Sequence, residues 1–188
     1  MTNFKTIVAD PPWNETGGGK IKRGADRHYP LLKTHEIIEV MLRCPLWSPE
    51  PRGSHLYLWV TNNFVPDGLE VMKALGFTYK TNIAWVKDRI GLGQYFRGQH
   101  ELALFGVRGR WPVKEALPTV LKAKRRAHSQ KPDEFYVNVM RSSPGPFLEM
   151  FAREKREGWS VWGNEVEGPT DEDEFKWKAG WLWTEEEW

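Results

Sequence analysis

The residues best suited to chemistry are Asp10, Pro11, Pro12 and Trp13, which follow the apolar run Thr6–Ala9. Such a run predicts a buried strand, and ligands of open α/β sheets bind where strands end. Two successive prolines fix φ near about −65° and donate no N–H, so we expect both proline carbonyls to be held as bare acceptors. With a carboxylate and a flat indole, they could grip a planar base that carries an exocyclic amine. The alternative is a rigid turn with Trp13 as ordinary core, and these residues alone leave both open.

Asp-Pro-Pro-Trp at the end of an Ile-Val-Ala strand resembles the catalytic motif of the MT-A-seventy family of adenine-N(6) methyltransferases, which use S-adenosylmethionine. Further stretches resemble other motifs of that family, in the same order: Leu56–Thr61, Ile83–Lys87, His100–Glu101, Ser129–Glu134, Phe147–Arg153 and Trp162–Glu165. An ordered series over most of the chain is far more specific than one tetrapeptide. The chain is therefore identified as a member of this family.

The resemblance makes Asp10, Pro11, Pro12 and Trp13 the catalytic motif. The Asp10 carboxylate and the Pro11 carbonyl would accept the hydrogens of the target amine. Two such acceptors help the nitrogen to approach sp³ geometry and receive the positive charge that develops there. Trp13 would stack on the base, and in a duplex the adenine would have to flip out of the stack.

Three further residues are implied for the target pocket. Tyr29 would close over the base, although a surface aromatic is an equal alternative. Lys87 and Glu101 stand where one predicted strand ends and the next begins, and in relatives these positions line the pocket. Their alternative is a cross-strand ion pair.

The cofactor-binding residues that the resemblance implies, besides Asp10, are Lys131, Phe151, Arg153, Asn164 and Glu165. Lys131 precedes a helix that starts at a proline, and we expect it to meet the methionine carboxylate of S-adenosylmethionine. The product would be S-adenosylhomocysteine. Relatives commonly have Gly at Ala152 and Arg-Pro-His-Asn at 153–156, where this chain has Arg-Glu-Lys-Arg. The ribose contacts after Arg153 are therefore left open.

Alternating strand-like and helical segments predict an α/β sheet of mostly parallel strands. The resemblance implies a Rossmann-like methyltransferase sheet with one antiparallel strand and a permuted motif order. The expected strands are Thr6–Ala9, His55–Val60, Thr81–Lys87, Glu101–Val107, Phe147–Phe151 and Ser160–Trp162. One helix is expected to be capped by Thr34, with Ile37, Ile38, Met41 and Leu42 on its apolar side. A second runs from about Pro66 to Leu75, with Leu69, Met72 and Leu75 inward, and a third begins near Pro132.

The chain has 188 residues, which suits one catalytic domain over 1–167 followed by an acidic, Trp-rich tail over 168–188. Residues 165–188 carry nine acids and two lysines, so the rest holds 25 basic and 16 acidic side chains. A basic body indicates a polyanionic partner, although a mixed solvated surface is the alternative. The single cysteine and the lack of a long apolar run favour a reducing cytoplasm and no membrane. The compact domain has no obvious separate target-recognition insert, which favours an enzyme of bacterial or phage type.

Three long, basic segments, 14–30, 88–99 and 108–129, are predicted to be functional loops, since unstructured connections of that length are uncommon. If the sheet gathers them around Asp10, they form a phosphate-binding rim. Five scattered histidines and one cysteine offer no metal-binding spacing, so no metal is expected.

The function expected is methylation of adenine N(6) in nucleic acid, with DNA favoured over RNA. RNA stays open because the pocket chemistry is the same, and so do a monomer and a dimer. A non-catalytic nucleic-acid-binding partner subunit is the alternative of another class. A methyltransferase for free nucleotides or small amines is a weaker one.

Overall fold

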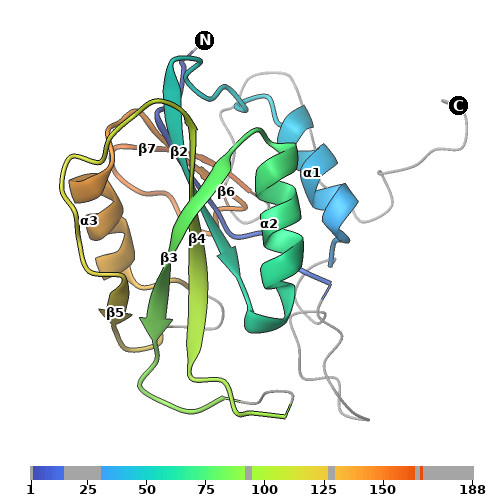
Figure 1. Cartoon of the computed structure of the whole chain (residues 1–188), viewed down its shortest axis with the longest axis vertical. Helices are drawn as coiled ribbons and strands as arrows, with labels where there is room; N and C mark the ends of the chain where they lie inside the picture. The colour runs from blue at the N-terminus through green and yellow to red at the C-terminus, as the bar shows by residue number, and fades with distance from the viewer. Residues whose placement is uncertain (1, 15–30, 92–94, 127–129, 164–165, 167–188) are drawn as a thin grey trace, which may run out of the picture.

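A computed structural model describes residues 2–14, 31–91, 95–126, 130–163 and 166. The strands form one sheet in the order β5-β3-β4-β2-β1-β6-β7 (Figure 1). Their bounds are β1 Thr6–Ala9, β2 Gly53–Val60, β3 Thr78–Val86, β4 His100–Gly109, β5 Val120–Lys122, β6 Phe147–Met150 and β7 Trp159–Trp162. Among these strands, β4 alone runs antiparallel to its neighbours. The predicted Rossmann-like sheet with an antiparallel strand is confirmed.

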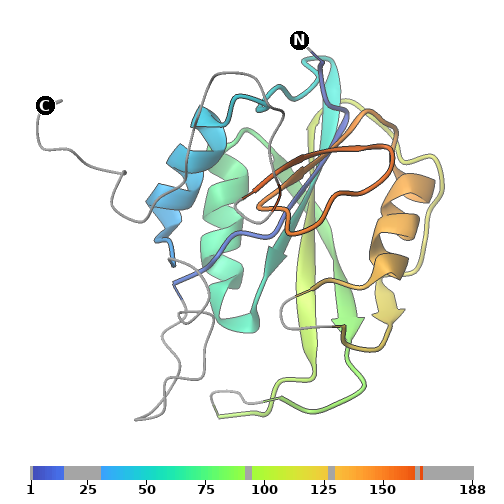
Figure 2. The ribbon, with the colours of Figure 1, turned by 180° about the vertical axis from the view of Figure 1, so that it is seen from behind.

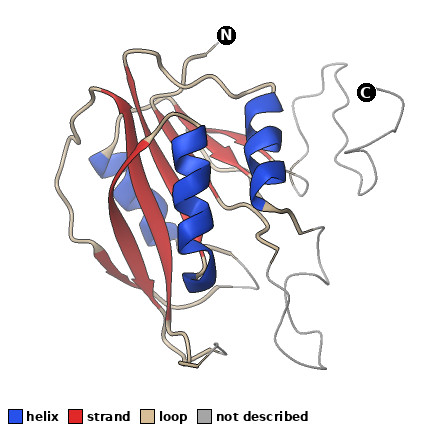
Figure 3. Cartoon of the chain, turned by 45° about the vertical axis from the view of Figure 1, so that its right-hand side comes forward, coloured by secondary structure: helices blue, strands red, loops and turns tan. Residues whose placement is uncertain are grey.

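Helices cover both faces of the sheet (Figures 2 and 3). The helices α1 (Thr34–Arg43) and α2 (Val65–Ala74) lie on one face, and α3 (Asp133–Ser142) lies on the other. Successive side chains of β1 point to opposite faces of the sheet and set this division. Ile7 and Ala9 join the α1–α2 core, while Val8 joins the α3 core. A four-residue strand buried on both faces therefore holds the centre of the molecule together.

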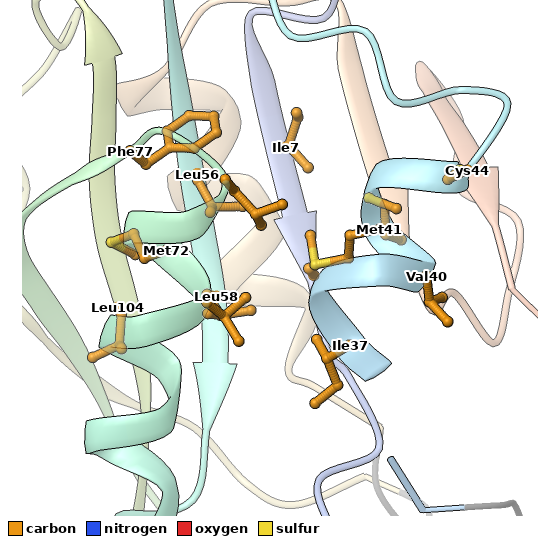
Figure 4. Close-up of a cluster of buried hydrophobic side chains, with 14 of the residues drawn as sticks. Ile7, Ile37, Val40, Met41, Cys44, Leu56, Leu58, Met72, Phe77 and Leu104 are labelled. Atoms are coloured by element: carbon orange, nitrogen blue, oxygen red, sulfur yellow. The ribbon is translucent and has the colours of Figure 1, made fainter. Parts of the chain in front are cut away.

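The core between the sheet and α1 is built from residues at helical spacing (Figure 4). Ile37, Val40, Met41 and Cys44 are all buried there. Leu42 was predicted on this side but is 51% exposed, because the stripe at i, i+3, i+4 and i+7 from Ile37 points away from it.

The prediction of which residues of α2 face the sheet is also partly wrong. Leu69 is 38% exposed, whereas Gly68, Val71 and Met72 face the sheet. Gly76 ends this helix in the left-handed region, at φ 80°, as expected of a glycine stop.

Thr34 is the first residue of α1 rather than its cap, and the cap is Lys33. The Thr34 hydroxyl instead donates a hydrogen bond of 2.6 Å to the Asp67 carboxylate, which ties α1 to α2. A short strand, β5, was not predicted and lies inside the segment expected to be a loop. In the described part of the chain, no helix has the length and apolar character needed to cross a bilayer.

The packing of α2 predicts the effect of enlarging Gly68. A Cβ at this position would lie 2.5 Å from Val60 Cγ1 and 2.9 Å from Leu104 Cδ1. Alanine improves helix propensity by about 1 kcal/mol, but overpacking a core costs about 1–3 kcal/mol. We expect Gly68→Ala to lower the free energy of unfolding in urea, whereas the exposed control Glu70→Ala stays within about 0.5 kcal/mol of wild type. A more stable Gly68→Ala would contradict this packing.

Candidate active site

The Asp10–Trp13 segment leaves the carboxyl end of β1 as a turn whose backbone groups are engaged. Trp13 N–H donates to the Pro11 carbonyl at 2.9 Å, and Leu32 N–H donates to the Pro12 carbonyl at 2.8 Å. The expectation of two bare carbonyls is therefore wrong. A carbonyl oxygen has two lone pairs, so the Pro11 oxygen keeps one acceptor site.

Trp13 is part of the core, with 6% of its surface exposed. Its indole N–H donates to the Trp59 carbonyl at 2.8 Å, and its ring stacks on Phe64 at a centroid distance of 5.6 Å. The indole thus anchors the Asp10 turn to the end of β2. Stacking on a target base would need a ring face that this arrangement keeps buried.

Four charged side chains meet beside that turn. Lys131 Nζ lies 2.8 Å from Asp10 Oδ2 and 3.2 Å from Glu101 Oε2, and Glu101 Oε1 accepts a short hydrogen bond from Lys87. The two ammonium groups also lie over indole rings, Lys131 at 5.1 Å from the Trp59 centroid and Lys87 at 5.0 Å from that of Trp85. We call Asp10, Lys87, Glu101 and Lys131 the charge cluster.

Burial and pairing act in opposite directions on the pKa values of the cluster. Burial on its own raises the pKa of Glu101, but the ammonium groups of Lys131 and Lys87 outweigh it and lower that pKa from 4.5 to about 2. Burial lowers the pKa of Lys131, but the carboxylates of Asp10 and Glu101 raise it above its ordinary value. Lys131 and Glu101 are therefore both charged at neutral pH.

A narrow cleft opens from Asp10 toward β6. Its lining includes the predicted residues Asp10, Lys131, Phe151 and Arg153, together with Gln130, Tyr136, Glu149 and Glu154, which sequence reasoning missed. The cavity volume is only about 20 Å³, close to the space of one water molecule.

Glu149 gives the cleft an unusual wall. Its Oε1 accepts a hydrogen bond of 2.6 Å from the Tyr136 hydroxyl, while its buried Oε2 has no hydrogen-bond partner among the described residues. Arg156 Nε lies 3.7 Å from that Oε2, and its guanidinium lies 3.6 Å from the centre of the Tyr136 ring. Burial raises the pKa of Glu149, against the hydrogen bond from Tyr136 and the charge of Arg156. An acid inside the otherwise apolar strand β6 was the available sequence signal for this residue.

The backbone at the far end of the cleft is strained. Phe151 follows β6 with φ at 61°, a backbone conformation that residues other than glycine rarely adopt. A Cβ at Gly163 would lie 2.2 Å from the Ala152 carbonyl oxygen, so the turns after β6 and β7 pack backbone to backbone. Strain of this kind is concentrated at ligand sites.

The described residues include most but not all of the predicted site. Asp10, Glu101 and Lys131 are brought into contact, Lys87 joins them through Glu101, and Phe151 and Arg153 line the adjoining cleft. The cross-strand ion pair considered for Lys87 and Glu101 is present. Tyr29, Asn164, Glu165 and the tail over 168–188 lie outside the described residues.

A larger cavity, of about 280 Å³, lies between α3, the sheet and residues 113–119. Tyr57, Phe105 and Phe135 give it an apolar lining, and its carboxylate, Glu115, is paired with Arg141. It shares no residue with the cleft, and it lacks the cluster of charges found beside Asp10. We therefore place the candidate active site at Asp10 rather than in the larger cavity.

The sequence matches a known protein family. The family model MT-A70 matches residues 4–165, a range that contains the charge cluster and the cleft. The chain belongs to the MT-A70 family. The sequence prediction of this family is confirmed.

Two relatives, one from a plant and one from human, are named N(6)-adenosine-methyltransferases. A putative N(6)-adenosine-methyltransferase MT-A70-like protein of Medicago truncatula is 31% identical over 185 residues. The N(6)-adenosine-methyltransferase catalytic subunit METTL3 of Homo sapiens is 30% identical over 181. Each match covers 89% of this chain, which spans 27% of the plant protein and 29% of the human one.

A third relative is nearer in size. The type II methyltransferase M.MunI of a Mycoplasma species is 28% identical over 197 residues. The match covers 89% of this chain and 82% of that protein.

The charge cluster predicts a pH-dependent contribution of Glu101 to folding. Because the folded pKa of Glu101 lies below 4.5, its carboxylate stabilises the fold above about pH 4.5, and this stabilisation is lost as the pH falls toward 2. Glu101→Gln should be clearly less stable than wild type at pH 7, and the gap in Tm should narrow between pH 5 and pH 3. Glu115→Gln, which removes a half-exposed partner of Arg141, serves as the control and should cost little at either pH. A gap for Glu101→Gln that is constant over this range would contradict the pairing.

Proposed function

We propose that this MT-A70 protein transfers a methyl group from S-adenosylmethionine to N(6) of adenine in nucleic acid, most favourably DNA. The observation that carries the proposal is the Asp10 carboxylate, which is fixed by Lys131 at the carboxyl end of β1 and faces the adjoining cleft. Ligand sites of open α/β sheets lie at this edge.

The residues of the Asp10 turn would act on the amine of the target base. Asp10 and the free lone pair of the Pro11 carbonyl accept its two hydrogens, which concentrates the lone pair on nitrogen. As the new N–C bond forms, positive charge builds on that nitrogen, and Asp10 stabilises it and takes up the departing proton. Preorganised acceptors of this kind cost no reorganisation at the moment of reaction.

The charge cluster supports this role of Asp10. Lys131 balances the charge of the carboxylate and directs one oxygen, and Glu101 in turn holds Lys131. Lys87 and Glu101 would form one wall of the target pocket, and Tyr29 would close it. Trp13 contributes by anchoring the Asp10 turn to β2 through the Trp59 carbonyl.

The cleft would hold the cofactor, and its chemistry fits. Glu149 Oε2 forms an ion pair with Arg156 but accepts no hydrogen bond among the described residues, so a hydroxyl or ammonium group of a ligand would satisfy it. Lys131 and Arg153 offer cations for a carboxylate, Phe151 offers an aromatic wall, and Asn164 and Glu165 would take the ribose. When bound, S-adenosylmethionine supplies the methyl group as part of a sulfonium and leaves as S-adenosylhomocysteine.

Two observations bear on the nucleic acid. The match to M.MunI, which its name describes as a type II methyltransferase, covers most of both chains and supports DNA. The plant and human relatives are named N(6)-adenosine-methyltransferases, which makes RNA the second candidate. Incubation with mixed DNA and RNA oligonucleotides, followed by mass spectrometry of the nucleosides, decides between them.

The role of Asp10 is tested by Asp10→Asn, which keeps the shape of the side chain but removes its charge. We expect methyl transfer to fall by at least about a hundredfold, the scale seen when one preorganised polar group is removed. Circular dichroism should show an unchanged fold. Wild-type turnover by this variant would contradict the proposed chemistry.

The position of Trp13 predicts a different outcome for Trp13→Ala. Because the indole is buried and donates to the Trp59 carbonyl, its removal should lower the free energy of unfolding by about 3–5 kcal/mol. Trp13→Phe should retain most of the stability through its contact with Phe64. A stable Trp13→Ala that fails only to bind target would instead support stacking of the indole on the base.

A further inference from the structure

Two aromatic side chains on the connection between β3 and β4 stand fully in solvent. Tyr95 is 103% exposed and Phe96 is 88% exposed. By contrast, Trp85 near the end of β3 and Phe105 in β4 are only 3% and 8% exposed. Two adjacent exposed rings are large apolar surfaces of the kind that mark an interaction site.

The described part of this connection is anchored rather than loose. Lys87 N–H donates to the Gln99 carbonyl at 2.8 Å, and Gly91 N–H donates to the Gly98 carbonyl at 2.7 Å. Arg97 Nε adds a hydrogen bond of 3.2 Å to the Gly91 carbonyl. Backbone hydrogen bonds between the two arms of the connection therefore continue beyond Val86 and His100, the last paired residues of β3 and β4, and the connection extends beyond the sheet (Figure 1).

The two ends of this connection between β3 and β4 lie at the charge cluster. Lys87 follows β3, and Glu101 is the second residue of β4. Tyr95 lies four positions before Gln99, a Cα span of at most about 14 Å for extended chain. The rings are thus within a few nucleotides of the candidate site but are not part of it.

Several cations lie on this connection or beside its base. Arg89 and Arg97 lie on it, and the segment Lys122–Arg126 runs beside its base, where Ala123 N–H donates to the Val86 carbonyl at 3.4 Å. Acids balance part of this charge, since Asp88 pairs with Arg89 and Arg125. Arg126 pairs with Asp133 and Glu154, and Arg97, Lys122 and Lys124 add further positive charge. Exposed rings among cations match a single nucleic-acid strand, whose bases stack on aromatics while its phosphates meet Lys and Arg. A symmetric contact with a second copy would bring these cations together, which is unfavourable.

We propose that Tyr95 and Phe96 are a stacking platform for unpaired bases that flank the target adenine. The inference rests on the proposed function, because it assigns the rings to the same nucleic acid whose adenine enters the Asp10 site. It makes single-stranded or locally opened nucleic acid the preferred substrate. The rings contribute binding energy and do not take part in methyl transfer.

The test is the affinity of the double variant Tyr95→Ala/Phe96→Ala for fluorescein-labelled oligothymidylate, measured by anisotropy. This probe lacks adenine, so binding is separated from turnover. We expect Kd to rise at least tenfold, with no change in the slope of log Kd against log salt, because no phosphate contact is removed. Tyr95→Phe/Phe96→Tyr should bind as wild type does. Tyr79→Ala, a tyrosine 40% exposed near the opposite end of β3, is the matched control and should leave Kd unchanged.

Two outcomes would contradict the stacking role proposed for Tyr95 and Phe96. Unchanged affinity of the double variant would show that the rings do not touch the strand. A double variant that converts a wild-type dimer to a monomer in sedimentation would show that this face joins two copies. Failure of the proposed function is separate, because a wild-type protein that binds oligothymidylate through the rings but methylates no adenine would refute the catalytic assignment alone.

Discussion

The candidate site depends on one ammonium group, Lys131 Nζ, placed between the carboxylates of Asp10 and Glu101. These three residues come from distant parts of the chain, at the end of β1, the start of β4 and the approach to α3. Two carboxylates in a partly buried site repel each other unless a cation separates them. Lys131 therefore supports both the local fold and the orientation of the acid assigned to catalysis.

The topology explains why these groups meet. The strands β1, β2 and β3 all end at one edge of the sheet, while β4 runs antiparallel and so begins there. Asp10 and Lys87 follow strands that end at this edge, and Glu101 lies where β4 enters. A parallel β4 would carry Glu101 to the opposite edge. The site therefore requires the antiparallel direction of β4, which places Glu101 at the same edge as Asp10.

Residue patterns predicted much of this arrangement. Apolar runs located most strands, and the ordered motifs identified the family and the residues Asp10, Glu101 and Lys131. The partners of individual side chains could not be predicted from the sequence, because contacts between residues such as Tyr136, Glu149 and Arg156 depend on how α3 and β6 pack. The engaged carbonyl of Pro12 escaped prediction for the same reason, since Leu32 is brought to Pro12 only by the fold, whereas the Pro11 carbonyl accepts from Trp13 within the turn itself. The exposed sides of α1 and α2 were misjudged at Leu42 and Leu69, where apolar residues flank the buried stripe.

The central claim, that Asp10 polarises the target amine, is tested most directly by a crystal structure with S-adenosylhomocysteine and a short adenine-containing oligonucleotide. The account predicts adenine N(6) at hydrogen-bond distance, about 3 Å, from an Asp10 carboxylate oxygen, with the cofactor in the cleft beside Glu149. A cofactor bound in the apolar cavity under α3, or an adenine amine well beyond contact with Asp10, would contradict it.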